Sequence, residues 1–234
     1  AIERVINRSM EGEWEYVQIE KCFGRILGKD IIATTDVPWF DRSPYDGYAI
    51  FAESTQSASS QQPVQLEVIG TIGAGSVYND GILPNQAVKI MTGAAIPKGA
   101  NAVVMKELTK EVKRNGKVYV EIKRNISPGE NLSRIGEDVK KGSLLVEKGT
   151  MINPGITAIL ATFGFYHIPV MKRPRVAIIA TGSELLEVYQ PLEPGKIRNS
   201  NAYMLQAQIL RAHAKPVGCG IVNDSFENVL AAVK

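Results

Sequence analysis

A continuous apolar run precedes a polar turn in the sequence Val176-Ala177-Ile178-Ile179-Ala180-Thr181-Gly182-Ser183-Glu184. Such a run is typical of a short strand in a parallel sheet that is covered on both faces. In open sheets of this kind, ligands bind at the carboxyl ends of the strands. The turn Thr181-Gly182-Ser183-Glu184 is therefore either a ligand site, where Gly182 allows close approach to the backbone, or an ordinary turn from strand to helix.

The residues after this turn continue the alternation of strand and helix. Apolar residues recur at helical spacing between Asn201 and Ala212, and Pro216–Val222 is a second strand-like segment. The sequence Asp224-Ser225-Phe226-Glu227 has the form of a capping box, with Asp224 as the cap of a helix that runs to Val233. Two parallel strands are fewer than the about five or six that are usual in such sheets. We therefore expect residues 174–234 to be the truncated start of a doubly wound α/β domain, and the chain to be a fragment.

A different pattern fills residues 51–126, where short alternating apolar runs are separated by Gly, Pro and Asn. This pattern predicts a β-rich module. Asn115-Gly116 is the predicted turn of a hairpin, because both residues tolerate positive φ. A module inserted between two loops of a parent domain leaves and returns at nearby points, so Ala49 and Ser127 are expected to lie close together.

The flanking residues 1–50 and 127–173 are assigned to an N-terminal helical and β linker region. Two short helices are expected before Thr35, joined by the aromatic stretch Trp14-Glu15-Tyr16, and the second of them is placed near Glu20–Leu27. The predicted fold class is mixed α/β with several subdomains, in which the β-rich module is an insertion that precedes the truncated α/β domain.

The composition excludes several classes of function. The 234 residues include 27 basic and 24 acidic side chains, a net charge of +3 without runs of like charge, which suits small anionic ligands and gives no footprint for nucleic acid or a membrane surface. Two cysteines far apart and two histidines make neither a zinc motif nor a disulfide framework, so a reducing cytoplasm is expected. No apolar run approaches the ~20 residues of a membrane span, so we expect a soluble protein.

The most unusual segment is the loop Asp36-Val37-Pro38-Trp39-Phe40-Asp41-Arg42-Ser43-Pro44-Tyr45-Asp46-Gly47-Tyr48-Ala49. Its prolines fix the backbone, and carboxylates on a rigid loop can hold a divalent cation or orient a water molecule. The alternative is turn chemistry, in which Asp41 and Asp46 accept hydrogen bonds from nearby backbone amides.

Three other loops carry residues whose roles the sequence leaves open. Thr92 follows a predicted strand and either binds an anion or caps a turn. Arg134 and Asp138 either bind phosphate and metal or form a solvated charged turn. The glycine-rich stretch Gly70-Thr71-Ile72-Gly73-Ala74-Gly75 opens no predicted helix, which argues against a phosphate-binding loop.

Taken together, these loops resemble the molybdopterin molybdotransferase family, of the MoeA and gephyrin E-domain type. The matching segments follow the family's order and cover nearly the whole chain: Cys22-Phe23-Gly24-Arg25-Ile26-Leu27, Asp36-Val37-Pro38, Asp46-Gly47-Tyr48-Ala49, Met91-Thr92-Gly93-Ala94, Ile96-Pro97, Ala102-Val103-Val104, Gly136-Glu137-Asp138, Thr181-Gly182-Ser183-Glu184-Leu185 and Gly195-Lys196-Ile197-Arg198. The family's later motifs and its small C-terminal β domain have no counterpart in these residues. Trp39 stands where glycine is common in the family, and Pro44-Tyr45 where a small residue and methionine are frequent.

The resemblance implies a reaction in molybdenum cofactor biosynthesis. Molybdate is inserted into adenylylated molybdopterin and AMP is released, with Mg²⁺ as the usual divalent cation. The resemblance also implies a homodimer, an upstream adenylyltransferase and apo-molybdoenzymes as partners, and a molybdopterin-binding role for residues 174–234. A fragment that ends within this domain is expected to be inactive by itself.

Active-site positions of the family carry over residue by residue. Catalytic roles are assigned to Asp46, Thr92 and Glu184, cofactor binding to Asp138, Gly182, Ser183 and Asp224, and metal binding to Asp46 and Glu184. The pterin phosphate, AMP and molybdate are all anions. The carboxylates among these site residues therefore make most sense as ligands of a bridging cation or as groups that orient water. Thr92 and Glu184 fall in different predicted subdomains, so a two-fold partner is expected to supply one side of the cleft.

Two other functions belong to different classes. The gephyrin branch of the family clusters receptors, so an interaction scaffold without catalysis is the main alternative, although no gephyrin-like linker is present in the sequence. A generic nucleotide-binding α/β protein would require a glycine fingerprint after Ala180, and Thr181-Gly182-Ser183-Glu184 is not one.

Overall fold

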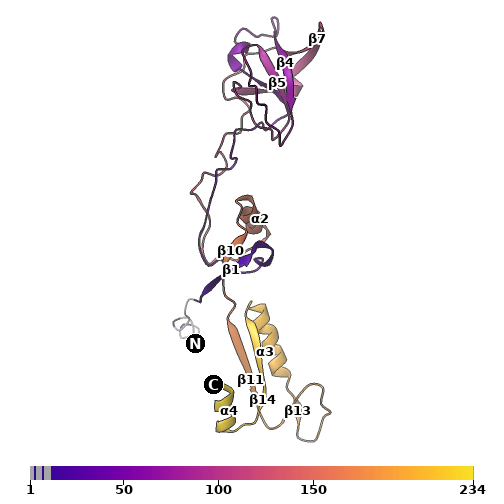
Figure 1. Cartoon of the computed structure of the whole chain (residues 1–234). Coiled ribbons are helices and arrows are strands. Elements are labelled where there is room, and N and C mark those ends of the chain that lie inside the picture. The colour runs from indigo at the N-terminus through magenta and orange to yellow at the C-terminus, as the bar shows by residue number, and fades with distance from the viewer. Residues whose placement is uncertain (1–2, 4–6, 8–11, 234) are drawn as a thin grey trace. The chain divides into compact units, whose positions relative to one another are not determined.

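The structure is a computed structural model that describes residues 3, 7 and 12–233 (Figure 1). It divides into two compact units: Ala1–Ile31 with Leu144–Lys234, and Ile32–Ser143. Strands and helices are mixed along the chain, which confirms the predicted fold class. The first of the two helices predicted near the N-terminus falls mostly on residues that lie outside the described part of the chain.

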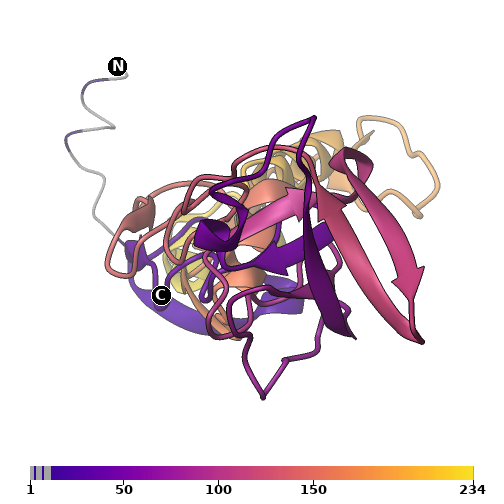
Figure 2. The same cartoon turned by 90° about the horizontal axis from the view of Figure 1, so that it is seen from above.

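The Ile32–Ser143 unit is built on a six-stranded sheet with the strand order β6-β3-β5-β4-β8-β7. Its strands are β3 (Gly47–Ile50), β4 (Val64–Ile72), β5 (Gln86–Ile90), β6 (Ala102–Met105), β7 (Thr109–Arg114) and β8 (Lys117–Ile122). Neighbouring strands are antiparallel, except that β4 and β5 are parallel. Figure 2 shows β4, β8 and β7 side by side. Short 3₁₀ helices cover Ala52–Thr55 and Lys106–Leu108.

Strand β3 is buried on both faces of this sheet. Tyr48 and Ile50 belong to one hydrophobic cluster, and Ala49 belongs to a second cluster with Val88. Burial on both faces holds a strand in a single register, because a slip would expose its apolar side chains. The residues that flank β3 are therefore attached to a fixed part of the unit.

The hairpin predicted in this unit is confirmed. Asn115 and Gly116 form the hairpin turn between β7 and β8, with φ of 51° and 76°. The compact unit is wider than the predicted 51–126 module, because β3 belongs to its sheet and residues 37–42 form bridges with 133–139. Ala49 pairs with Val103, whose amide donates to the carbonyl of Glu130 at 3.0 Å, so the two ends of the predicted module reach the same strand.

In the other unit, β1 (Trp14–Gln18) pairs antiparallel with β10 (His167–Met171). The helix α2 (Pro154–Thr162) begins at Asn153, whose side chain accepts a hydrogen bond from the amide of Ile156. A core that contains Leu27, Leu160 and Val170 joins these elements. The short strands β2 (Ile31–Ile32) and β9 (Leu144–Val146) complete this part of the chain.

The helix predicted near Glu20–Leu27 is wrong, and so is the linker predicted at Trp14-Glu15-Tyr16. The linker is strand β1, and only Ile19–Lys21 is helical, as one 3₁₀ turn. Gly24 has φ of 70°, which ends any right-handed helix, and Leu27 then bridges to Val170. Burial of Leu27 against the β1–β10 sheet determines the local structure more strongly than helix propensity.

The C-terminal part has the predicted order of strand, helix, strand and helix. Strands β11 (Arg175–Thr181) and β14 (Lys215–Val222) are parallel, and α3 (Ser200–Arg211) packs on both of them. The short strands β12 (Leu185–Leu186) and β13 (Ile197–Arg198) lie between β11 and α3 in sequence and pair with each other. The helix α4 (Phe226–Val233) ends the described chain.

Asp224 does not cap α4, which corrects the predicted capping box. The hydroxyl of Ser225 accepts the hydrogen bond from the amide of Asn228 at 3.3 Å. Ser225 directly precedes the first helical residue, Phe226, and Asp224 lies one position too early to cap this helix. Within the described residues, no helix is long and apolar enough to cross a membrane.

Candidate functional site

The residues predicted from the sequence fall into two sets. Asp46, Thr92 and Asp138 belong to the Ile32–Ser143 unit, and Gly182, Ser183, Glu184 and Asp224 belong to the other unit. Each set is described within its own unit.

Asp46 and Thr92 are in direct contact. Oδ1 of Asp46 accepts a hydrogen bond from the amide of Thr92 at 2.7 Å and another from its hydroxyl at 2.9 Å. Both residues are exposed, and within the described part of the chain Oδ2 of Asp46 accepts no hydrogen bond. The sequence left open whether Thr92 binds an anion or caps a turn, and the structure shows that it holds a carboxylate.

The sheet brings these two residues together. Asp46 directly precedes β3 and Thr92 lies two residues after β5, and the antiparallel register that pairs Gly47 with Ile90 puts both at one end of the sheet. Gly47 is required here, because a Cβ at this position would lie 2.1 Å from the carbonyl oxygen of Val104 in β6. The sequence Asp46-Gly47-Tyr48 thus combines a carboxylate held by Thr92, a close backbone approach and a core aromatic residue.

The pKa of Asp46 is lowered below the ordinary value of an aspartate. The main cause is the hydrogen bond from the Thr92 amide, followed by the one from its hydroxyl; slight desolvation opposes them, and the positive charge of Lys106 adds to them. Hydrogen bonds donated to a carboxylate favour its charged form. Asp46 is therefore ionised at neutral pH, and in this state a carboxylate can accept hydrogen bonds or bind a cation but cannot donate a proton.

Asp138 and its neighbours form a separate charged turn in the same unit. Arg42 pairs with Asp138 at 3.7 Å, and Arg134 pairs with Asp41 at 2.8 Å. Oδ1 of Asp41 also accepts from the amide of Ile135 at 2.8 Å. These bonds reach Asp41 from residues 93 and 94 positions away, so they are not the local turn chemistry that the sequence offered for Asp41, and they give Arg134 a protein partner.

The second set lies at the carboxyl ends of β11 and β14, where the sequence placed it. Thr181 is in register with Val222, and the turn Gly182-Ser183-Glu184 follows directly. Gly182 has φ of 153°, and a Cβ on it would lie 2.6 Å from Oε2 of Glu184. The carboxylate of Glu184 therefore lies over a position that only glycine leaves free.

Residues 193–199 hold this turn in place. Nζ of Lys196 donates to the carbonyl of Ser183 at 2.6 Å, and the amide of Ile197 donates to the carbonyl of Glu184 at 2.9 Å. Glu184 is thus flanked by two main-chain restraints, although its carboxylate is exposed.

A cavity of about 360 Å³ opens beside this turn, and its lining includes Thr181, Glu184, Arg198, Asn199 and Ser200. Asn199 is 5% exposed, and its side-chain oxygen caps α3 by accepting from the amide of Ala202 at 3.2 Å. A helix N-terminus and a guanidinium both favour an anion. Sequence reasoning gave no role to Arg198 or Asn199, although Arg198 ends the segment Gly195-Lys196-Ile197-Arg198 that carried part of the resemblance.

Asp224 lies at the same sheet edge, because it follows β14 by two residues and Val222 accepts from the amide of Gly182 at 3.4 Å.

The glycine-rich stretch in the other unit is explained partly by packing. Gly70 is inside β4, and a Cβ there would lie 2.6 Å from the ring of Tyr78.

The described residues contain no group of three or more His, Cys, Asp or Glu side chains placed to bind a metal. Mg²⁺ is usually held by one or two carboxylates together with substrate phosphates. Oδ1 of Asp46 already accepts two hydrogen bonds from Thr92, whereas Glu184 lines the cavity with Arg198. Such a donor set would hold Mg²⁺ through Glu184 only together with a phosphate of the substrate.

The sequence matches two families of known proteins. The family described as "MoeA N-terminal region (domain I and II)" matches residues 1–164, and the one described as "Probable molybdopterin binding domain" matches residues 177–234. The chain is 52% identical over 234 residues to the molybdopterin molybdenumtransferase of Bacillus subtilis (strain 168), and this alignment covers 100% of the chain and 54% of that protein.

Solved structures agree with the sequence matches. Two structures of the molybdopterin biosynthesis moeA protein from Pyrococcus horikoshii have TM-scores of 0.89 and 0.83, with 35% and 39% sequence identity. They cover 99% and 94% of this chain, which matches 58% of each of those chains. The chain spans about half the length of the curated relatives that it matches.

Proposed function

The chain belongs to the MoeA family, and we propose that it contributes to the insertion of molybdate into adenylylated molybdopterin with release of AMP. Its relatives named molybdopterin molybdenumtransferase support this proposal. Because the chain spans about half of their length, we assign the activity to the full-length protein and expect these 234 residues to insert no molybdenum alone.

The observation that carries the proposal is the fixed, ionised carboxylate of Asp46. Thr92 holds one of its oxygens with two hydrogen bonds, so the other oxygen is presented to a ligand in one orientation. Release of AMP adds one water across a phosphoanhydride bond. In our proposal Asp46 accepts a hydrogen bond from that water and aligns it, a task that needs a charged group whose position is set in advance.

The second set of residues suits the binding of an anion. In our proposal Arg198 and the N-terminus of α3 bind the phosphate of molybdopterin, and Gly182 and Ser183 let the ligand approach the backbone. Asp224 orients polar groups of the same ligand at the adjacent strand end. Asp138 is proposed to support the loop that carries Asp41 and Arg42, through its ion pair with Arg42.

We propose that Mg²⁺ binds together with the substrate, with Glu184 as its protein ligand and Asp46 as a second candidate. When bound, this cation would neutralise phosphate charge as the phosphoanhydride is cleaved. The task of the chain is to keep Glu184 in place, which the contacts of Ser183 with Lys196 and of Glu184 with Ile197 achieve.

The assembly and location of the protein are also proposals that rest on the family. We propose a cytoplasmic homodimer that receives its substrate from an adenylyltransferase and passes its product to apo-molybdoenzymes. Light scattering of the full-length protein tests the dimer: a mass of two chains is expected, and a monomer at working concentration would contradict it.

Reconstitution of a molybdenum-free molybdoenzyme tests the function. Full-length protein, adenylylated molybdopterin and molybdate should restore activity and release AMP. Absence of both AMP and activity from folded full-length protein would reject the proposal. Restoration by the 234-residue chain alone would reject only the part that calls it insufficient.

A further inference from the structure

The sheet end that carries Asp46 and Thr92 has a third polar residue. Strand β3 lies between β5 and β6 and is antiparallel to both, so the residue before β3 neighbours the residues that follow the other two strands. Gly47 pairs with Met105 of β6, and the amide of Lys106 donates to the carbonyl of Asp46 at 3.0 Å. Asp46 therefore has Thr92 from one neighbouring strand and Lys106 from the other.

The ammonium group of Lys106 is available for a ligand. Lys106 is exposed, and within the described part of the chain its side chain has no hydrogen bond and no ion pair. The nearby carboxylate of Glu111 is already occupied, because its Oε1 accepts from Lys89 at 2.7 Å and from the hydroxyl of Tyr48. Lys106 nevertheless acts electrostatically on both Asp46 and Glu111.

An anionic substrate that approaches Asp46 meets a negative charge. The ammonium of Lys106 offsets part of this negative charge and gives the anion a partner for charge-assisted hydrogen bonds. We propose that Lys106 is a further substrate-contacting residue, which binds a tetrahedral oxyanion of the substrates beside the Asp46–Thr92 pair. This inference rests on the proposed function, and its ligand is either a phosphate of the adenylylated substrate or molybdate itself.

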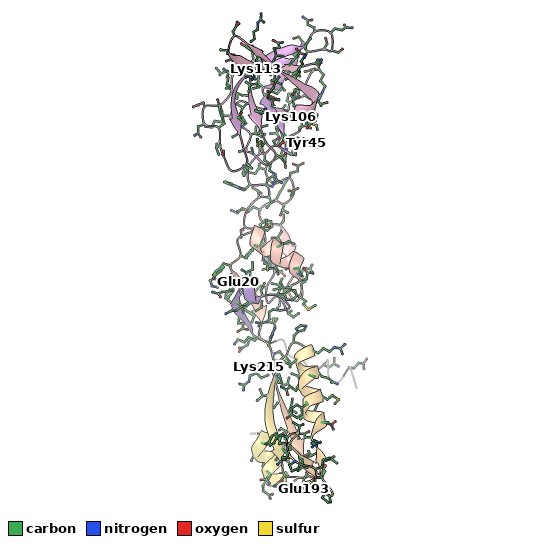
Figure 3. The ribbon with its side chains drawn as sticks, turned by 90° about the vertical axis from the view of Figure 1, so that its right-hand side faces the viewer. Glu20, Tyr45, Lys106, Lys113, Glu193 and Lys215 are labelled. Carbon is green, nitrogen blue, oxygen red and sulfur yellow. The ribbon has the colours of Figure 1, made fainter. Side chains whose placement is uncertain are left out.

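Acylation of lysines in the full-length protein, read by peptide mass spectrometry, tests the contact directly. Saturating pyrophosphate, AMP or molybdate should slow the labelling of Lys106 by about tenfold, because the ammonium that reacts is covered. Lys113 is the internal control; it lies on β7 near the hairpin turn, away from Lys106 and Tyr45 (Figure 3). Protection by pyrophosphate and AMP identifies a phosphate site, and protection by molybdate alone identifies a molybdate site. Equal labelling of Lys106 with and without all three anions overturns the proposal.

Substitutions separate ligand contact from structure. The variant Lys106→Met should raise the KM for adenylylated molybdopterin by about 10- to 100-fold, as expected for the loss of a hydrogen bond to a charged group. Lys106→Arg should restore most of the affinity, and Lys113→Met, which removes the same charge elsewhere, should leave KM unchanged. Equal KM values for Lys106→Met and wild type would contradict the inference. If the full-length wild type shows no turnover, the proposed function fails, whereas the labelling result still decides the role of Lys106.

Discussion

Asp46 and Thr92, 46 residues apart in sequence, are joined by two hydrogen bonds to a single carboxylate oxygen. The contact is made at one end of a sheet in which strand β3 is buried on both faces. A carboxylate held in this way stays ionised and keeps one orientation, which are the properties that the proposed water-aligning role requires.

The first prediction concerns the acidity of Asp46. Thr92→Val removes the hydroxyl donor and keeps both the amide donor and the size of the side chain, so the pKa of Asp46 should rise part of the way towards its ordinary value. An NMR titration of the Asp46 carboxyl carbon measures this. An unchanged pKa would show that the hydroxyl does not act on Asp46.

The same variant has a predicted stability profile. A lowered folded-state pKa stabilises the protein above the unfolded-state pKa, and this stabilisation is lost as pH falls through the folded-state pKa. The free energy of unfolding should therefore be lower for Thr92→Val than for wild type at neutral pH. This difference should shrink as the pH falls into the acid range. A difference that grows as pH falls would contradict the assignment.

The second prediction concerns the glycine beside Asp46. Gly47→Ala should lower the free energy of unfolding by about 2–3 kcal/mol, because the added Cβ would lie 2.1 Å from the Val104 carbonyl and neither strand can move freely. Chemical denaturation measures this effect. Gly73→Ala is the matched control, since a Cβ at Gly73 meets no atom within 4 Å. Equal stability of the two variants would show that β3 and β6 do not pack as described.

The strands around Asp46 were predictable from sequence. Short apolar or alternating runs, separated by turn residues, mark β4, β5, β6 and β8. The Asp46–Thr92 contact was not, since it depends on β3 pairing with β5 across nearly forty residues, and local patterns carry no register information of that range. Lys106 was missed for the same reason, because it becomes a neighbour of Asp46 only when β6 pairs with β3.

The N-terminal segment shows the opposite error. The residues Glu20–Leu27 have acceptable helix propensity, yet Leu27 is fully buried in a core built from segments more than 100 residues away. Tertiary burial determined the backbone there. Asp224 and Ser225 are adjacent, and both residue types are good helix caps. Ser225 is the cap because it directly precedes the first residue of α4.

The third prediction concerns Gly182. Gly182→Ala should displace the carboxylate of Glu184, since the new Cβ would lie within 2.9 Å of three of its atoms. The far end of a side chain moves cheaply, but a φ of 153° strains any residue with a Cβ, so stability should fall as well, and activity per folded full-length enzyme should fall further. Gly218→Ala is the control, because Gly218 lies on the paired strand β14 and a Cβ there meets no atom within 4 Å. Full activity of Gly182→Ala would show that the position of Glu184 is unimportant.

The fourth prediction tests whether two chains contribute to one reaction. Full-length Thr92→Ala and Glu184→Gln proteins, each of which we expect to be inactive alone, are mixed, and heterodimers are purified with two affinity tags. The family resemblance predicts that the heterodimers are clearly more active than either parent variant. Verified heterodimers that remain inactive would show that one chain supplies both residues.

The most direct test of the central claim is AMP release by full-length Asp46→Asn. This substitution removes the charge but keeps the size of the side chain. The new side chain can still accept hydrogen bonds from Thr92. We predict that AMP release from adenylylated molybdopterin falls by about 100-fold or more, as is typical when a group that acts on the reacting atoms is lost. The melting temperature should fall only slightly, because the charge-dependent part of the contact is lost but the amide oxygen of the new side chain can still accept from Thr92. Wild-type rates of AMP release from a folded Asp46→Asn protein would contradict the account.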